Sequence, residues 1–185
     1  MRSQTTKICV ALVSFLAFTT GLFAQGQLNF ITANGNTAFG QVFFSPSVPL
    51  GGPYVGQLYG SLTPNVIGFA AIGSASPFFS NSGYINAGTV SPPGTFGAQT
   101  FYYQLRVWDS SVASTFEAAS FGFSPVGVSE IASMTLGGLP AEGFPPFPPP
   151  NSNGFTSFVL IPEPSTITLA IVGFVSLIFF PRKRG

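Results

Sequence analysis

The sequence predicts an all-β protein: one antiparallel β-sandwich or jelly-roll-like domain, flanked by an N-terminal signal helix and a C-terminal transmembrane helix. The 22 glycines and 17 prolines among 185 residues divide the chain into short runs, as turns between strands do. Residues 100–108 alternate in polarity, which is typical of a strand with one buried face. Between the two terminal apolar runs, hardly any segment has the spacing of an amphipathic helix.

Residues 1–24 have the organisation of a secretory signal peptide. Arg2 and Lys7 form a basic start, and a long apolar run follows them. The small Ala24 ends this run and precedes the polar Gln25, so we predict cleavage between these two residues. A signal segment that stays uncleaved and anchors the chain is the alternative.

Residues 25–161 are predicted to form one exported β-domain. In the clearest strand, residues 100–108, Phe101 and every second residue after it are apolar, whereas Tyr102, Gln104 and Arg106 lie on the opposite face. Further strands are expected at residues 27–32, 39–44, 54–59, 66–71, 84–90, 127–134 and 154–160.

Two other local patterns lie between these strands. Residues 114–119 predict a short helical turn, with Ser114 as the N-cap and Glu117 as its capping-box partner. Residues 143–150 are rich in proline and predict an extended polyproline II segment. We expect this segment either to pack on the domain or to link it to the last strand.

The composition of the exported domain excludes several functions. Residues 25–161 contain one basic residue, Arg106, against four acidic residues, so their net charge is −3. A single arginine cannot neutralise a run of phosphates, which excludes nucleic-acid binding. The chain has no histidine and its one cysteine, Cys9, lies in the signal segment, so His- and Cys-based catalysis is excluded. Without a carboxylate-rich loop, we expect neither a metal nor another cofactor.

Two groups of residues are candidates for a function of the domain. Tyr102, Arg106 and Trp108 form an aromatic and polar surface on which the sugar rings of an exopolysaccharide could stack. Contact with a second layer of the fold is the alternative for this surface. Asp109 and Glu117 follow the same strand and would be the carboxylates of a hydrolase, if they face each other. A solvated loop, or an ion pair between Arg106 and Asp109, is the simpler interpretation of these charges.

Residues 162–185 predict a membrane-sorting segment. Residues 165–180 form an uncharged, largely apolar run, which is short for a hydrocarbon core of about 30 Å. A short span requires a thinner bilayer or flanking side chains that extend to the headgroups. The alternative is a buried hairpin of a soluble core that ends in a solvated basic tail, but the lack of any charge in the run disfavours it.

Short motifs flank this run on both sides. The basic cluster Arg182-Lys183-Arg184 follows it and is predicted to lie on the cytoplasmic side. The motif Pro162-Glu163-Pro164 precedes it and, because proline cannot continue a helix backwards, is predicted to be extended at the outer membrane surface. The exported domain would then lie outside the cytoplasm.

The order of motif, span and basic cluster resembles the PEP-CTERM sorting signal. That resemblance implies recognition and processing by a membrane-embedded, exosortase-like enzyme in bacteria with an outer membrane and exopolysaccharide. Segments of the central domain are also similar to those of PEP-CTERM proteins from Verrucomicrobia-type bacteria, a group that implies no catalytic residue. These segments are residues 54–60, 62–64, 103–109, 115–119 and 155–158.

Residues and resemblance together predict an exported, non-enzymatic cell-surface or extracellular-matrix protein. We expect an inner-membrane, single-pass intermediate that later reaches the cell surface or the medium. The expected partners are the membrane and an exosortase-like enzyme, with exopolysaccharide as a further candidate. A carbohydrate-binding module is the alternative function.

Overall fold

The structure is a computed structural model, and its described residues are 25–34, 37–38, 40–121, 124–141 and 144–160. These residues form an all-β fold with mostly antiparallel sheets, as the sequence predicts. Their helical content is small: the 3₁₀ helix η1 (Val66–Gly68) and the α-helix α2 (Phe116–Phe121). The predicted terminal helices lie outside the described residues, and no helix within those residues is long and apolar enough to cross a membrane.

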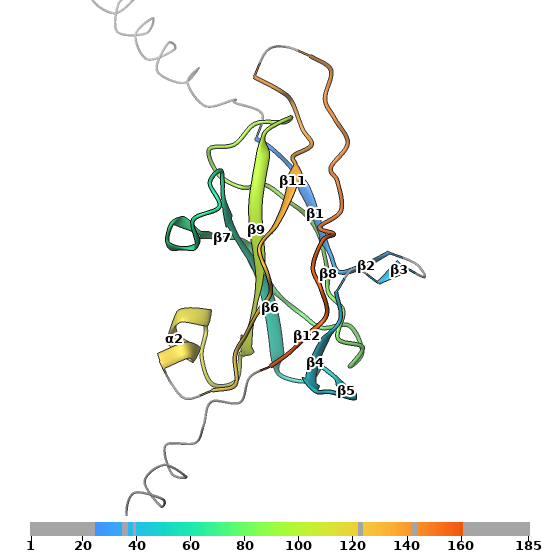
Figure 1. The fold of residues 1–185 in the computed structure, drawn as a ribbon, viewed down its shortest axis with the longest axis vertical. Coiled ribbons are helices and arrows are strands. Elements are labelled where there is room, and N and C mark those ends of the chain that lie inside the picture. Colours follow the sequence, from blue (N-terminus) through green and yellow to red (C-terminus); the bar gives the residue numbers. More distant parts are fainter. Residues whose placement is uncertain (1–24, 35–36, 39, 122–123, 142–143, 161–185) are drawn as a thin grey trace, which may run out of the picture.

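A five-stranded antiparallel sheet is the centre of the fold (Figure 1). Its longest strand, β9 (Thr100–Asp109), pairs with β6 (Tyr54–Ser61) along the whole of β6. On the other side of β6 lies β7 (Ala70–Pro77). The remaining neighbours of β9 are two short strands, β10 (Gly127–Val128) and β11 (Ala132–Thr135).

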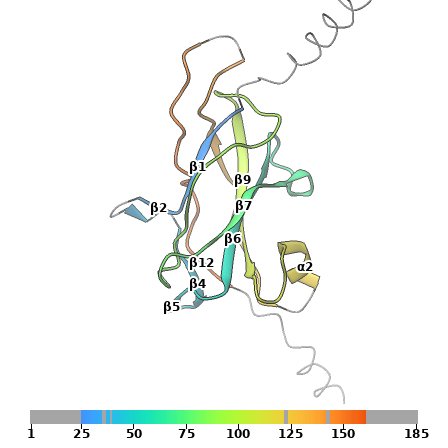
Figure 2. The same ribbon diagram turned by 180° about the vertical axis from the view of Figure 1, so that it is seen from behind.

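Smaller sheets cover one face of this central sheet. One pairs β1 (Leu28–Ile31) with β8 (Asn86–Val90). Another contains β12 (Phe158–Val159), β4 (Val42–Ser45) and β5 (Val48–Pro49), in which β12 is parallel to β4. A two-stranded hairpin, β2 (Ala33–Asn34) and β3 (Thr37–Ala38), lies beside them. In Figures 1 and 2, β1 and β8 lie on one side of β6 and β9, and α2 lies on the other.

The alternation of residues along β9 determines which face of the sheet each side chain occupies. Phe101, Tyr103, Leu105 and Val107 are at most 2% exposed and belong to one core cluster with residues of β1, β4, β6 and β7. The predicted apolar face is therefore confirmed. Trp108 points to the other side, where it joins a second cluster with residues of β6 and α2. Both faces of β9 are covered, which explains why so much of this strand is buried.

Two of the predicted strands are interrupted because polar side chains bond to the local backbone. The run at 66–71 begins as η1, since the side chain of Asn65 accepts a hydrogen bond from the N–H of Ile67, and β7 starts only at Ala70. The run at 127–134 is divided into β10 and β11. Between them, the hydroxyl of Ser129 accepts a hydrogen bond from the N–H of Leu105, which replaces a contact of the regular ladder.

The capping-box prediction for the helical turn was wrong. The hydroxyl of Thr115, not Ser114, accepts a hydrogen bond from the N–H of Ala118 at 3.2 Å. Thr115 is therefore the N-cap, and α2 begins one residue later. Glu117 does not return to the backbone of the cap; its carboxylate bonds to side chains of the central sheet instead.

The described part of the proline-rich segment packs on the domain, which was one of the two expectations. The N–H and carbonyl groups of Phe147 bond to those of Gly138, at 3.0 and 2.8 Å. The carbonyl of Pro150 accepts a hydrogen bond from the N–H of Asn29 at 2.8 Å. Backbone contacts therefore fix this segment along β1, although most of its side chains are exposed.

Candidate functional site

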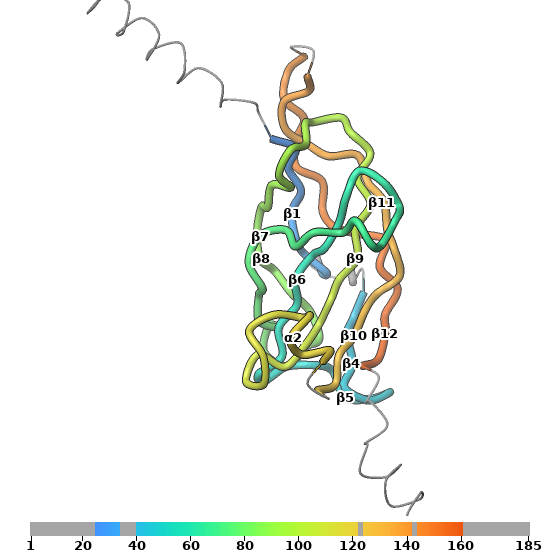
Figure 3. Tube along the Cα trace, turned by 90° about the vertical axis from the view of Figure 1, so that its left-hand side faces the viewer, coloured from blue at the N-terminus to red at the C-terminus, as the bar shows by residue number. Residues whose placement is uncertain are grey.

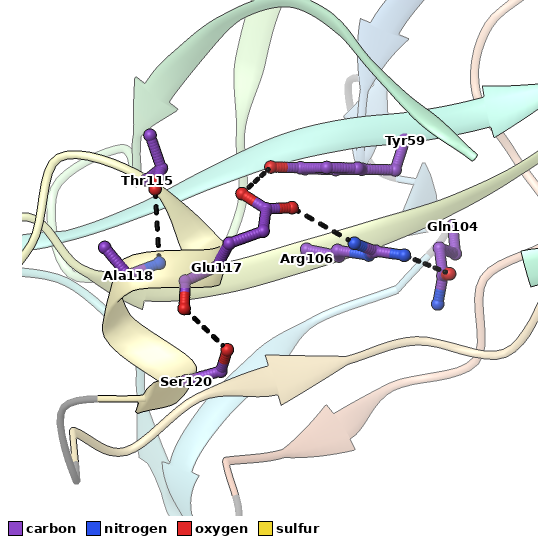
Figure 4. Close-up of polar contacts among 7 residues, drawn as sticks. All are labelled: Tyr59, Gln104, Arg106, Thr115, Glu117, Ala118 and Ser120. Carbon is purple, nitrogen blue, oxygen red and sulfur yellow. Dashed lines mark hydrogen bonds and ion pairs between the residues drawn. The ribbon is translucent and has the colours of Figure 1, made fainter. Parts of the chain in front are cut away.

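A group of charged, polar and aromatic residues meets on the face of the central sheet that α2 covers. Tyr59 comes from β6, Gln104 and Arg106 come from β9, and Phe116 and Glu117 come from α2. We refer to these five residues as the Arg106 cluster (Figure 4 shows four of them, without Phe116). The antiparallel register places Tyr59 opposite Gln104, so Tyr59 and Arg106 are close neighbours on one face.

The guanidinium of Arg106 lies against two aromatic rings, which also pack edge-on against each other. Its Cζ atom is 4.1 Å from the ring centroid of Tyr59 and 5.1 Å from that of Phe116, which are cation–π distances. The side chain is only 15% exposed, and its Nε atom is buried without a hydrogen-bond partner. Arg106 is thus held mainly by stacking, as a planar guanidinium with a long apolar stem allows.

Polar contacts complete the cluster. Arg106 Nη1 lies 3.4 Å from Glu117 Oε1, and Nη2 donates to Gln104 Oε1 at 3.3 Å. The hydroxyl of Tyr59 donates to Glu117 Oε2 at 3.1 Å. These distances are at the long end of the range for hydrogen bonds, and the side chain of Glu117 is 54% exposed. Solvent therefore weakens the ion pair, and the stacking contributes more to holding the cluster together.

The environment of Tyr59 favours its neutral form. Burial is the largest cause, and the negative charge of Glu117 and the hydrogen bond to it act in the same direction. Together they raise the pKa of Tyr59 to about 12, against a small opposing effect of Arg106. At neutral pH the tyrosine is a hydrogen-bond donor, and it cannot act as a base.

The surface predicted to bind sugar is largely covered. Trp108 is 1% exposed, its ring packs edge-on against Phe116, and its Nε1 donates to the carbonyl of Ala113 at 3.0 Å. Tyr102 is half-buried against the same apolar cluster. Arg106, Tyr102 and Trp108 do share one face, but no face of the Trp108 ring is open to a sugar. The alternative interpretation was that this surface contacts a second layer of the fold. The structure has that contact, and the second layer is α2.

The two carboxylates proposed for a hydrolase have separate partners. Asp109 Oδ1 accepts hydrogen bonds from the N–H of Ser111 at 2.8 Å and from its hydroxyl at 2.5 Å. Glu117 is bonded to Tyr59 and Arg106, so the ion pair of Arg106 is with Glu117 and not with Asp109. Each carboxylate thus stabilises its own neighbourhood. Among the described residues, no group of three or more acidic or thiol side chains could hold a metal ion.

Two hollows in the surface lack charged side chains. The larger, of about 380 Å³, lies beside the loop after β6 and is lined by Gly60, Ser61, Leu62, Thr63, Gly68, Ala70, Ile72, Pro92, Pro93, Thr95 and Phe101. The smaller, of about 270 Å³, is lined by Ala33, Phe79, Ser82, Tyr84, Ile85 and Asn86. The polar side chains that line them carry hydroxyl and amide groups, among them the phenol of Tyr84 in the smaller hollow.

Most residues of the predicted sorting and cleavage sites lie outside the described residues: Ala24, Pro162, Glu163, Pro164, Arg182, Lys183 and Arg184. The described chain begins at Gln25, which is exposed, and the next residue, Gly26, already donates its N–H to the carbonyl of Thr95 at 2.9 Å. At the other end, Leu160 is 1% exposed and donates its N–H to the carbonyl of Phe43 at 2.8 Å. Gly26 and Leu160 therefore both belong to the folded domain.

Comparison with known proteins gives no further guide, since no family model, curated protein or solved structure matches this chain. The sequence predicts that Gln104 and Arg106 share a strand face and singles out Glu117, but it does not indicate that Tyr59 and Phe116 join them. Only the register of β6 against β9 brings Tyr59 to Arg106. The one sequence signal for this contact is that Tyr59 and Arg106 both lie in alternating runs.

Proposed function

We propose that this chain is an exported, non-enzymatic protein of the cell surface or extracellular matrix, and that residues 162–185 sort it as a PEP-CTERM-type signal. The observation that carries the proposal is the position of this signal. Leu160, which is 1% exposed in the core, lies two residues before Pro162-Glu163-Pro164 in the sequence. A processing enzyme would therefore meet the motif just outside the domain, with the apolar run and the basic cluster behind it.

The contacts at both domain ends support this division of the chain. Among the described residues, Gly26 and Leu160 both have backbone hydrogen bonds to the domain, to Thr95 and to Phe43 respectively. Cleavage of the signal peptide or of the sorting signal would not require the domain to unfold. The proposed layout is a signal peptide at 1–24, the domain at 25–161 and a membrane helix at about 165–180.

A β-sandwich is the architecture we propose for the exported domain. In support, β1 and β4 contribute to the same core cluster as β6, β7 and β9, as two facing sheets would. The charges of the domain are few, and its arginine is used internally in the Arg106 cluster. This fits a structural or surface role better than recognition of a charged ligand. The burial of Trp108 disfavours the alternative carbohydrate-binding function at Tyr102, Arg106 and Trp108.

Replacing Glu163 by alanine tests the sorting function. The variant keeps the apolar run and its insertion energy, so the protein should still reach the membrane. If an exosortase-like enzyme reads the motif, Glu163→Ala should accumulate in the membrane, uncleaved and not displayed. Immunoblots of membrane, outer-surface and medium fractions measure this. The matched control is Glu130→Ala, which removes an exposed carboxylate of the domain and should sort normally.

Two further results would bear on the same proposal. Neutral residues in place of Arg182, Lys183 and Arg184 should release unprocessed protein, because the short span loses its cytoplasmic anchor. N-terminal sequencing of exported protein should recover Gln25 or a neighbour. An unchanged size and distribution of Glu163→Ala in every fraction would contradict sorting and leave an ordinary single-pass membrane protein.

A further inference from the structure

The short connection between β7 and β8, two strands that lie side by side (Figure 3), forms a sharp and strained turn. The N–H of Phe79 donates to the carbonyl of Tyr84 at 2.7 Å, and the carbonyl of Phe79 accepts the N–H of Ser82 at 2.8 Å. The second bond closes a turn whose two central residues both have left-handed backbone, with φ of 44° at Ser80 and 55° at Asn81. Turns of this hand usually contain Asn-Gly, because a residue with a Cβ is strained at positive φ.

Neighbouring segments hold this turn in place. The N–H of Gly83 donates to the carbonyl of Leu50 at 2.9 Å, and its carbonyl accepts the N–H of Val42 at 3.0 Å. The side chain of Asn81 takes part as well, since its Oδ1 accepts the N–H of Gly52 at 3.0 Å. These bonds fix the turn against β4 and against the residues that follow β5.

The fixed turn displays an aromatic ring to solvent. Phe79 is 72% exposed, whereas the preceding residue, Phe78, is 7% exposed and belongs to the core. The turn therefore costs free energy twice, through its backbone conformation and through the exposure of the ring. Strain that the surrounding contacts maintain is concentrated at binding sites, where it preorganises a side chain for a ligand.

Phe79 lies at the edge of the smaller of the two hollows, of about 270 Å³. We refer to this hollow, lined by Ala33, Phe79, Ser82, Tyr84, Ile85 and Asn86, as the Phe79 hollow. It lies on the β8 side of the central sheet, and the Arg106 cluster lies on the α2 side. None of the six side chains is charged, so the hollow offers no counter-charge to an acidic or basic ligand.

Polar groups accompany the two rings of the hollow. The hydroxyl of Tyr84 and the Nδ2 of Asn86 have no hydrogen-bond partner among the described residues. Asn86 Oδ1 accepts the N–H of Gly88 at 3.3 Å, which fixes the amide and leaves its N–H groups as donors. A purely apolar ligand would bury these groups without a partner, which is costly. The hollow therefore suits a neutral ligand that has both an apolar face and hydroxyl groups.

We propose that the Phe79 hollow binds one neutral sugar residue. The C–H face of the sugar ring covers Phe79, while ring hydroxyls bond to the hydroxyl of Tyr84 and the amide of Asn86. The volume fits a single ring, because pockets for larger, drug-sized ligands hold about 300–1,000 Å³. This inference goes beyond the proposed function and does not depend on it.

Sugar binding by the full chain tests the proposal. The protein is kept in a detergent without a sugar headgroup, and saturation-transfer NMR measures binding of glucose, galactose, mannose and N-acetylglucosamine, with glucuronate as the charged comparison. Phe79→Ala removes the ring, Tyr84→Phe removes only the hydroxyl, and Asn86→Asp removes the N–H donors but keeps Oδ1. Phe121→Ala is the matched control, because Phe121 is 86% exposed at the end of α2, on the other side of the sheet.

We expect at least one of the four neutral sugars to bind, with a Kd of about 1 mM. Phe79→Ala should weaken binding by about tenfold or more, because it removes the apolar contact. Tyr84→Phe and Asn86→Asp should each weaken binding several-fold, and Phe121→Ala should leave it unchanged. Emission of the buried Trp108 shows in each variant that the domain is folded.

Three results would overturn the proposal: no binding of any neutral sugar, binding that Phe79→Ala leaves unchanged, or glucuronate bound as well as the neutral sugars. If Phe79→Ala alters the emission of Trp108, Tyr84→Phe decides instead, because it keeps the ring in place. An equal loss in Phe121→Ala and Phe79→Ala would assign the binding to another surface. None of these results bears on the sorting function, which does not involve the hollow.

Discussion

Arg106 is the one basic residue between positions 25 and 161, and it is used within the fold. Its guanidinium contacts the rings of both Tyr59 and Phe116, and its ion pair with Glu117 is half in solvent. We expect Arg106→Ala to lower the free energy of unfolding by about 2 kcal/mol, because it removes both stacking contacts and leaves a gap. Glu117→Ala should cost about 1 kcal/mol or less, since exposed ion pairs contribute little.

Urea unfolding followed by Trp108 fluorescence measures both variants, because the Trp108 ring packs on Phe116. Arg106→Met, which refills the space without a charge, should recover much of the loss, as apolar replacements of buried charges often do. Glu130→Ala is the control and should change stability by no more than about 0.5 kcal/mol. A Glu117→Ala variant as destabilised as Arg106→Ala would mean that the ion pair, and not the stacking, holds the cluster.

Tyr59 should ionise only at strongly alkaline pH. Its folded-state pKa of about 12 exceeds the ordinary value of 10.0, so folding favours the neutral phenol. The unfolded chain releases this proton first, and stability should therefore be unaffected below about pH 10 and fall as the pH rises towards about 12. Glu117→Gln removes the negative charge beside the hydroxyl and should lower the pKa of Tyr59, while burial, the largest cause, keeps it above the ordinary value.

Ultraviolet absorbance of phenolate during alkaline titration measures this, with Tyr59→Phe identifying the contribution of Tyr59. A titration of Tyr59 that is identical in the original protein and in Glu117→Gln would contradict the contact between them. Sequence analysis could not foresee this pair. Glu117 was visible as one of few carboxylates, but Tyr59 is 58 residues away, and nothing local indicates that they meet.

At the scale of elements, the N-cap of α2 offers a direct test of the corrected helix start. Thr115→Ala removes the hydroxyl that accepts the N–H of Ala118 and should cost about 1 kcal/mol in the free energy of unfolding. Ser114→Ala is the matched control, one residue earlier, and should be close to neutral. Chemical denaturation of both variants gives the comparison. A larger loss for Ser114→Ala would restore the cap expected from the sequence.

The elements also show where sequence patterns succeed. The two-residue period of β9 correctly predicts which of its side chains join the main core, because successive side chains of a strand point to opposite faces of the sheet. The patterns fail at η1 and at the break between β10 and β11. There, Asn65 and Ser129 bond to the backbone, and such bonds depend on the side chain's surroundings more than on hydrophobic spacing.

At the scale of the whole molecule, the order of the strands in the sheets could not be predicted from the sequence. The β6–β9 pairing joins segments far apart in the chain, and β12 lies parallel to β4 across more than a hundred residues. Pairings of this kind depend on which buried faces fit together, and several registers bury the same number of apolar residues. The close approach of β6 to β9 is one such constraint: a Cβ on Gly60 would lie 2.4 Å from the carbonyl oxygen of Tyr102.

The parallel pairing of β12 leads to a prediction about where the domain ends. A chain that spans residues 25–161 retains β12 and the buried Leu160, so it should fold without the sorting segment. Ending the chain at Ser157 removes the pairing with β4 and the side chain that fills the core next to it. The loss should be at least about 3 kcal/mol in the free energy of unfolding, since deleting a buried leucine side chain alone costs about 2–5 kcal/mol.

Thermal and urea unfolding of the two chains, which end at residue 161 and at Ser157, measures this difference, again by the fluorescence of Trp108. Leu160→Ala in the longer chain should account for most of the loss, whereas Val159→Ala, on the outer face of the same strand, should cost little. Equal stability of the two lengths would mean that β12 belongs to the sorting segment and not to the domain. The motif would then no longer stand just outside a closed fold, and the proposed access of a processing enzyme to Glu163 would lose its structural basis.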